Sequence, residues 1–219
     1  MENNEDLNGK IGEIFKSLIE PREYSGKPIP LNRFSVGSLS FDPEKEIQRK
    51  LGLIEETPKD RLNMFRGTAL HNYIQERVKK MGFEPEHRLY YSFPHQWEYM
   101  GFKDITLVGV IDLISPEKNL MVELKSSTSS DRIEEYHKIQ LASYMKMYYE
   151  KHGVRYSGAV VKFGNSDITS EVVTWEEVDR YWNEIIKRSI YCAKQLDKKM
   201  AEQDLKSHPE KGGGLYSFS

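Results

Sequence analysis

Two acidic residues and a lysine stand close together in an apolar part of the sequence, and their types could support catalysis. Asp112 ends the segment Gly-Val-Ile-Asp, and Glu123 and Lys125 flank a leucine in the segment Met-Val-Glu-Leu-Lys. Because strand side chains alternate, Glu123 and Lys125 share a face, and a hairpin can bring Asp112 to the same end. Carboxylates among apolar residues need a compensating charge, which a hard divalent cation supplies. The pattern therefore indicates a divalent-metal and general-base cluster.

The elements that must position this cluster follow from the periodicity of apolar residues. A 3.6-residue period predicts helices and a two-residue period predicts strands. The three prolines of residues 20–32 indicate an extended connection, while residues 35–40 have the composition of a loop and residues 115–119 that of a turn. The expected helices cover residues 7–18, 58–80 and 131–150, with a short helix from Asp42 and a long one from Trp175, and the expected strands cover residues 88–93, 105–114, 120–124, 156–163 and 168–174. This order predicts an α/β sandwich around a mixed sheet.

The composition limits the class of protein. The chain has 219 residues, 38% of them hydrophobic, so we expect one elaborated domain with one core. The net charge is only -2, so nucleic-acid binding would need a local basic cluster. The single cysteine, Cys192, excludes an internal disulfide framework and indicates a reducing compartment. The acidic, polar N-terminus is unlike a signal peptide and no apolar run reaches about 18 residues, so we expect a cytoplasmic protein without a membrane partner.

Four motifs in this order resemble a known family. They are Gly67-Thr-Ala-Leu-His71, Gly109-Val-Ile-Asp112, Glu123-Leu-Lys125 and Gln140-Leu-Ala-Ser-Tyr144. Together they resemble the RecB-like branch of the PD-(D/E)XK nuclease superfamily, in particular the CRISPR-associated exonucleases and their viral relatives. The resemblance covers roughly residues 60–165. It implies a restriction-endonuclease-like core with a mixed central sheet of about five strands flanked by helices. It also implies one domain, made of a core at about 60–175, an N-terminal helical extension (1–59) and a C-terminal helix and tail (176–219).

The resemblance also implies a role for each residue of the cluster. Phosphodiester hydrolysis needs a cation that neutralises developing charge and lowers the pKa of a bound water. In the family, Asp112, Glu123 and the backbone carbonyl of Leu124 would bind Mg²⁺ or Mn²⁺, and His71 would be a further ligand that favours Mn²⁺. The catalytic residues would be Asp112, Glu123 and Lys125. Lys125 would orient the attacking water and stabilise charge, or act as a base with a pKa lowered by the cation.

Gln140 and Tyr144 are expected to bind substrate or support the site. Their spacing of four residues places them on one helix face, at the edge of the site. Purely structural roles stay open for some of these residues, because His71 and His137 could be packing histidines and Tyr144 also fits the buried stripe of its helix. Glu-x-Lys by itself is common in a chain this rich in both residues.

One departure from the family concerns its iron-sulfur cluster. The CRISPR-associated members commonly hold a cluster with four cysteines, and Cys192 alone cannot supply four thiolates. We therefore expect no iron-sulfur cluster, and residues 35–51 and 208–218, where its ligands would lie, must be held by packing or remain mobile. This favours a stand-alone or virus-encoded DNA-processing nuclease over a conventional role in spacer acquisition.

The expected partner is DNA, with single strands or single-stranded ends. The aromatic residues between Tyr90 and Tyr99, interleaved with Arg88 and histidines, could stack on unpaired bases or could fill the sheet core, and Lys103 and Lys162 are candidate phosphate contacts. The sequence thus predicts a Mg²⁺- or Mn²⁺-dependent deoxyribonuclease, an exonuclease or flap nuclease. The alternatives are a structure- or sequence-selective endonuclease and a non-cutting DNA-binding or scaffolding subunit, and the oligomeric state stays open.

Overall fold

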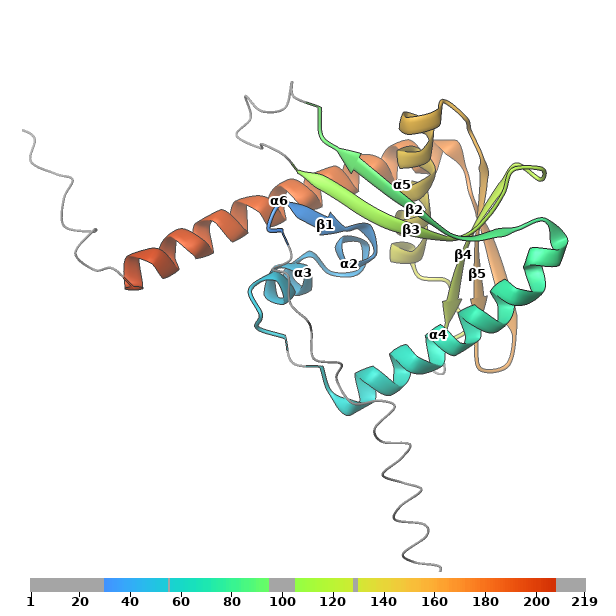
Figure 1. Cartoon of the computed structure of the whole chain (residues 1–219), viewed down its shortest axis with the longest axis horizontal. Coiled ribbons are helices and arrows are strands. Elements are labelled where there is room, and N and C mark those ends of the chain that lie inside the picture. The colour runs from blue at the N-terminus through green and yellow to red at the C-terminus, as the bar shows by residue number, and fades with distance from the viewer. Residues whose placement is uncertain (1–29, 55, 95–104, 128–129, 208–219) are drawn as a thin grey trace, which may run out of the picture.

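A computed structural model gives the fold of residues 30–54, 56–94, 105–127 and 130–207 (Figure 1). The elements in chain order are β1 (Arg33–Ser35), α2 (Val36–Phe41), α3 (Pro43–Lys50), α4 (Pro58–Val78), the 3-10 helix η1 (Lys79–Met81), β2 (Glu84–Ser92), β3 (Thr106–Ser115), β4 (Leu120–Ser126), α5 (Glu135–His152), β5 (Ser157–Phe163), β6 (Ile168–Val173) and α6 (Trp175–Ser207). The expected helix at residues 7–18 and the tail from residue 208 lie outside the described residues.

The strands form one mixed sheet with the order β1-β3-β4-β5-β6, and β2 pairs with β3 outside this path. The β2–β3, β3–β4 and β5–β6 pairs are antiparallel, whereas the β1–β3 and β4–β5 pairs are parallel. The predicted α/β class and mixed sheet flanked by helices are confirmed. The described sheet has six strands where about five were expected, because the short strand β1 was not predicted.

Helices cover both faces of the sheet (Figure 1). Leu113 and Ile114 are neighbours in β3 and point into different apolar clusters. Ile114 joins the main core, which α5 and α6 help to build, and Leu113 joins a smaller cluster with Ile74 and Val78 of α4. Successive strand residues face opposite sides, so α5 and α4 lie on opposite faces of the sheet.

The starts of α3 and α4 follow local sequence signals. Asp42 caps α3 by accepting the backbone N–H groups of Glu44 and Lys45, and Pro43 occupies the first turn, as expected. Thr57 and Asp60 form a capping box at the start of α4. The 3-10 helix η1 continues α4 and ends at Gly82. The backbone φ of Gly82 is 81°, in the left-handed region that favours glycine.

Residues 35–40 were predicted to be a loop, and this prediction is wrong, because residues 36–41 form helix α2. Val36 and Leu39 are fully buried in the main core, so burial outweighs the turn-like composition of this segment. The guanidinium of Arg188 on α6 donates to the carbonyl oxygens of Leu39 and Ser40 at the end of α2, over 2.9 and 2.6 Å. Contacts distant in sequence therefore stabilise a helix that the local sequence does not specify.

The prolines before Arg33 made residues 20–32 look like an extended connection, and the strand that follows was missed. Phe34 is fully buried and lies opposite Leu107 of β3. The parallel pairing of β1 carries the chain directly into α2, beside the middle of β3. Among the described helices none is long and apolar enough to span a membrane.

Candidate active site

The candidate site lies where one edge of β3 lacks a partner strand. Among the described strands, β2 pairs with one edge of β3 from Thr106 to Ile114, and the other edge is shared between β1 at residues 106–108 and β4 at residues 113–115. Residues 109–112 of this second edge therefore have no strand beside them. Asp112 is the last residue of this open interval.

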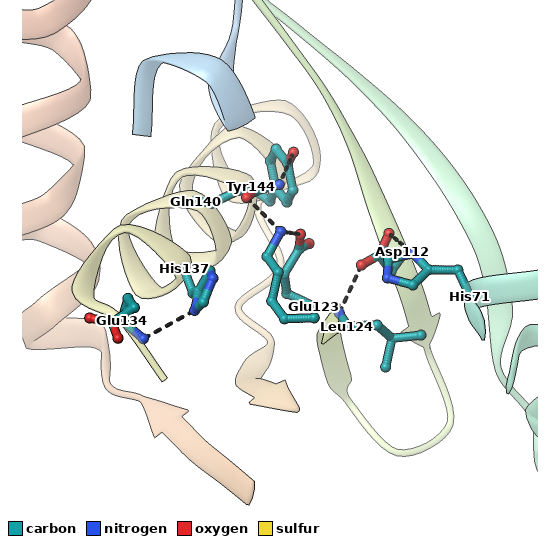
Figure 2. Close-up of polar contacts among 9 residues, drawn as sticks. His71, Asp112, Glu123, Leu124, Glu134, His137, Gln140 and Tyr144 are labelled. Atoms are coloured by element: carbon teal, nitrogen blue, oxygen red, sulfur yellow. Dashed lines mark hydrogen bonds and ion pairs between the residues drawn. The ribbon is translucent and has the colours of Figure 1, made fainter. Parts of the chain in front are cut away.

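The strands β3 and β4 separate next to Asp112. Their pairing ends at Leu113 and Val122, and one more step in the same register would place Asp112 opposite Glu123. Instead, Oδ2 of Asp112 accepts a 2.7 Å hydrogen bond from the backbone N–H of Leu124 (Figure 2). The N–H and C=O of one strand residue face the same neighbouring strand, so the Leu124 carbonyl also faces the β3 side. The Asp112 carboxylate and the Leu124 carbonyl therefore face the same gap between β3 and β4.

Glu123 is a buried carboxylate with one unused oxygen. Its Oε1 atom accepts a 2.7 Å hydrogen bond from Nζ of Lys125, and its Oε2 atom is buried without a partner. Burial, with a smaller contribution from the nearby Asp112 charge, raises the pKa of Glu123 to about 7. Burial acts to lower the pKa of Lys125, but the adjacent Glu123 carboxylate outweighs it and raises that pKa. Lys125 is therefore charged at neutral pH in the metal-free site.

His71 enters the site from α4. Its Nδ1 atom lies 3.6 Å from Oδ1 of Asp112 (Figure 2). The interaction with the Asp112 carboxylate raises the pKa of His71, although burial opposes it. Gly67, one turn before His71, lies beside β4, and a Cβ atom there would make an ordinary contact of 3.4 Å with Oγ of Ser126. His71 therefore faces the Asp112 carboxylate, and its role as a metal ligand stays a prediction.

Gln140 and Tyr144 extend the hydrogen-bond chain onto α5. Oε1 of Gln140 accepts a 2.9 Å hydrogen bond from Nζ of Lys125, and Nε2 of Gln140 donates to the Tyr144 hydroxyl over 2.9 Å (Figure 2). The Tyr144 ring lies on Gly109 so closely that a Cβ atom there would be 2.2 Å from Cε1 of the ring. Burial raises the pKa of Tyr144, so its hydroxyl stays neutral. The expected pair thus positions Lys125 through Gln140.

A metal ion has candidate ligands in this cluster, although the side chains are not arranged around one. In the part of the chain that the structure describes, no three His, Cys, Asp or Glu side chains form a metal-binding group. Glu123 is turned toward Lys125 rather than toward His71 and Asp112. The unpartnered Oε2 of Glu123 is nevertheless the kind of buried acceptor that a cation would satisfy. The donor set of two carboxylates, one imidazole and one carbonyl fits a divalent cation.

Three further residues named as candidates in the sequence make structural contacts instead. His137 is buried, and its Nδ1 atom accepts the backbone N–H of Glu134 over 3.1 Å, which caps α5. Burial lowers the pKa of His137 to about 3, so it is neutral. Lys162 is buried and its Nζ donates to the carbonyl of Arg132, so it is not a surface phosphate contact. Tyr91 packs edge-on against Trp182, with ring centroids 5.0 Å apart, so it belongs to the core.

The sequence reasoning missed a groove beside Gln140 and Tyr144. Its volume is about 360 Å³, and it lies against the start of β3. Arg33 lines this groove. It was not predicted as a functional residue because it follows the proline-containing segment that was expected to be an extended connection. The pairing of Arg33 with Thr106 places it there, and no local sequence pattern specifies this pairing.

A comparison with models of protein families identifies the family of this chain. The model of the PD-(D/E)XK nuclease superfamily matches residues 39–208 of this chain, which is more than half of it. The chain belongs to the PD-(D/E)XK nuclease superfamily. The (D/E)XK part of the family name matches Glu123, Leu124 and Lys125. The PD part matches Asp112, but the residue before it is Ile111 rather than proline. Members of this family typically use a divalent metal, and a nucleic acid is the substrate that membership implies.

Two solved structures share the fold of this chain at low sequence identity. The crystal structure of SSO0001 has a TM-score of 0.55 and 19% identity, and the match covers 81% of this chain and 86% of that chain. A "putative exonuclease" from Eubacterium rectale has a TM-score of 0.54 and 13% identity, with 80% and 86% covered. The alkaline exonuclease LHK-Exo from Laribacter hongkongensis matches at a TM-score of 0.43 and 14% identity, with 79% and 95% covered. No curated protein sequence matches this chain significantly.

Proposed function

We propose that this protein is a deoxyribonuclease that depends on Mg²⁺ or Mn²⁺ and acts as an exonuclease or flap nuclease on single-stranded ends. The observation that carries the proposal is the buried Oε2 atom of Glu123, which has no partner although Asp112 and Lys125 lie beside it. A buried, unpaired carboxylate oxygen is costly to the fold. A bound cation would compensate for this cost.

The proposed ligands are Asp112, Glu123, the Leu124 carbonyl and His71. A divalent cation held there supplies charge for the transition state of phosphodiester hydrolysis and lowers the pKa of a bound water. Asp112 is held by the Leu124 N–H, so its carboxylate stays at the open edge of β3. These contacts provide the preorganisation that electrostatic catalysis requires.

Lys125 is the proposed catalytic cation. Glu123 and Gln140 hold its ammonium group over 2.7 and 2.9 Å, so its position is fixed before substrate binds. Because its pKa is raised, the group carries a proton and acts as a charge and hydrogen-bond donor toward the attacking water and the phosphate oxygens. Tyr144 supports this arrangement because its hydroxyl oxygen accepts a hydrogen bond from the side-chain amide of Gln140.

Two alternatives would use the same fold. A structure- or sequence-selective endonuclease would use the same residues with a different DNA surface. A scaffolding subunit that no longer cuts would have no use for a buried Glu123 beside Asp112, and the retention of both residues speaks against it. We also propose that the chain is one domain, since β1, α2 and α3 pack into the same core as the central strands. The assignment to the RecB-like branch rests on the order of the four sequence motifs.

Cleavage of labelled DNA tests this function. Purified protein is incubated with end-labelled linear single strands, duplexes and circular single strands, in EDTA and in Mn²⁺ or Mg²⁺. An exonuclease degrades the linear single strand only when metal is present and leaves the circle intact. Cutting of the circle would favour the endonuclease. The Asp112→Asn and Glu123→Gln variants should be inactive, and a wild-type chain that binds DNA but cuts none of these substrates at millimolar metal would contradict the proposal.

A further inference from the structure

A groove of about 360 Å³ lies beside the candidate active site, on the part of the sheet built by β1, β2 and the start of β3. Gln140 and Tyr144 close it at the end nearest Lys125. The other lining residues are Arg33, Ser35 and Gly37 from β1 and α2, Arg88, Leu89 and Tyr90 from β2, and Val108, Gly109 and Val110 from β3. The groove therefore begins at the residues that position the proposed catalytic lysine.

The exposed strand side chains of the groove lie on the sheet face that α5 does not cover, whereas Gln140 and Tyr144 reach the groove from α5 itself. Opposite residues in a strand pair share a face, and Tyr90 lies opposite Val108 while Arg88 lies opposite Val110. The alternate residues Leu89, Leu107 and Ile111 are buried in the main core that α5 helps to build. The groove face is thus the outer face of a sheet whose other side is fully packed.

The chemistry of this face suits a nucleic-acid strand. Arg33 and Arg88 are exposed, and within the part of the chain that the structure describes no acidic side chain forms an ion pair with either guanidinium. Between them in the sheet, Tyr90 is 53% exposed and Val110 39% exposed. Arginines bind phosphates, and an exposed aromatic ring can stack on a base. In a chain with a net charge of -2, this local pair of positive charges meets the requirement for a basic cluster.

The distance from the groove to the candidate site matches the length of a few nucleotides. Val110 and Val108 precede Asp112 by two and four residues in β3. At about 3.3 Å per strand residue, Tyr90 lies roughly 13 Å along the strand from Asp112. A nucleic-acid chain with one phosphate at the site can therefore reach Tyr90 within a few nucleotides.

We propose that this groove binds the single-stranded part of the substrate next to the scissile phosphate. Tyr90 stacks on one unpaired base, and Arg33 and Arg88 bind the phosphates beside it. A base in a duplex already stacks on its neighbours and cannot lie on Tyr90, so the groove selects single-stranded nucleic acid. This inference rests on the proposed nuclease function and adds to it the strand that the enzyme holds.

Equilibrium binding in EDTA tests the groove without turnover. Fluorescence anisotropy measures the affinity of the full chain for a labelled single-stranded oligonucleotide and for a duplex of the same length. Tyr90→Ala should weaken single-strand binding about tenfold, as expected for one lost stacked base, and Tyr90→Phe should restore it. Arg88→Ala should lower the dependence of log Kd on log salt by about one. Tyr73→Ala and Arg155→Ala are the controls and should bind like the wild type.

The two controls match the test residues in type and exposure. Tyr73 is 58% exposed and lies two residues after His71 on α4, about 200° around the helix from the residue that faces the site. Arg155 is exposed and stacks on Trp175, near the end of β4 that is opposite to Lys125. Losses confined to the groove variants therefore cannot reflect a general loss of aromatic or positive surface.

Abasic sites placed one at a time along the oligonucleotide identify the stacked base. One position should weaken binding to the wild type and leave Tyr90→Ala unaffected. Wild-type affinity in Tyr90→Ala and Arg88→Ala, equal losses on duplex and single strand, or no single-strand binding by the wild type would each overturn the groove assignment. A chain that binds as described and does not cut in Mn²⁺ would instead refute the nuclease function, so the two failures are distinguishable.

Discussion

Nζ of Lys125 lies 2.7 Å from Oε1 of Glu123, and the second oxygen of that carboxylate is buried without a partner. One contact thus satisfies half of the carboxylate and fixes the lysine. In the metal-free protein the remaining oxygen is compensated most simply by a proton, which agrees with the raised pKa of Glu123. A cation in the site would compete with that proton. Metal affinity and pH are therefore linked through Glu123.

Divalent metal should stabilise the folded protein. A ligand at 100 times its Kd adds about 2.7 kcal/mol to the free energy of unfolding, or about 5–10 °C in Tm for a chain of this size. Differential scanning fluorimetry with Mn²⁺ should show this shift in the wild type, and Asp112→Ala should abolish it. Asp179→Asn, which changes an exposed carboxylate paired with Lys146, is the control and should keep the full shift. A metal-independent Tm in the wild type contradicts the assignment of the ligands.

The stability of the metal-free protein should fall as the pH rises from about 4.5 to about 7. The pKa of Glu123 is raised from 4.5 to about 7 in the fold, so between these values the native state holds a proton that the unfolded state has lost. The stabilisation is complete below pH 4.5 and is lost above pH 7. Unfolding by urea in EDTA across this range measures the effect. The Glu123→Gln variant cannot release this proton, so its stability should be flatter, and an identical profile in both proteins would argue against the raised pKa.

Replacement of Lys125 should separate catalysis from binding. Lys125→Ala removes the charge that acts on the attacking water and the transition state, so turnover should fall about 10²- to 10⁴-fold. The groove residues and the proposed metal ligands stay in place, so the Kd for single-stranded DNA should change little. Single-turnover cleavage and anisotropy on the same preparation measure both quantities. Equal losses in cleavage and affinity would make Lys125 a phosphate contact only.

The local part of the site could be predicted from sequence because it depends on short-range rules. Strand alternation places Glu123 and Lys125 on one face, and a helical spacing of four does the same for Gln140 and Tyr144. The structure joins the two pairs by the hydrogen bond from Lys125 to Gln140, which no spacing rule specifies. The roles of these residues in metal binding and catalysis stay predictions.

The missed elements depend on contacts between distant parts of the chain. β1 exists because Phe34 pairs opposite Leu107, and α2 exists because its apolar residues are buried and Arg188 binds its last carbonyl groups. A three-residue strand and a six-residue helix have too little intrinsic preference to show in a local pattern. The groove was missed for the same reason, since it needs Arg33 of β1 and Arg88 of β2 to flank β3 from opposite edges.

Gly109 should tolerate no side chain while Tyr144 is present. A Cβ atom at this position would lie 2.2 Å from the Tyr144 ring, so Gly109→Ala must displace that ring and should destabilise the fold by about 1–3 kcal/mol. The ring positions Gln140, so cleavage should fall as well. Chemical denaturation of Gly109→Ala, Tyr144→Ala and the double variant forms the test. The double variant should lose less unfolding free energy than the two single variants lose together. Strict additivity of these losses would show that the contact is unimportant.

The thiol of Cys192 should be inert, and the protein should be colourless. Its Sγ atom is fully buried and donates to the carbonyl of Pro43 over 3.4 Å, and burial raises the pKa of the thiol to about 12. A thiol in this state is neither a good nucleophile nor an available metal ligand. Folded protein should resist maleimide labelling at pH 8 and urea-unfolded protein should react, which controls for the reagent. Cys192→Ser should retain cleavage, with a modest loss of stability from the buried hydroxyl. Anaerobically purified protein that contains stoichiometric iron and absorbs visible light, or a Cys192→Ser variant that folds but does not cut, would show that this cysteine serves a cluster shared between chains.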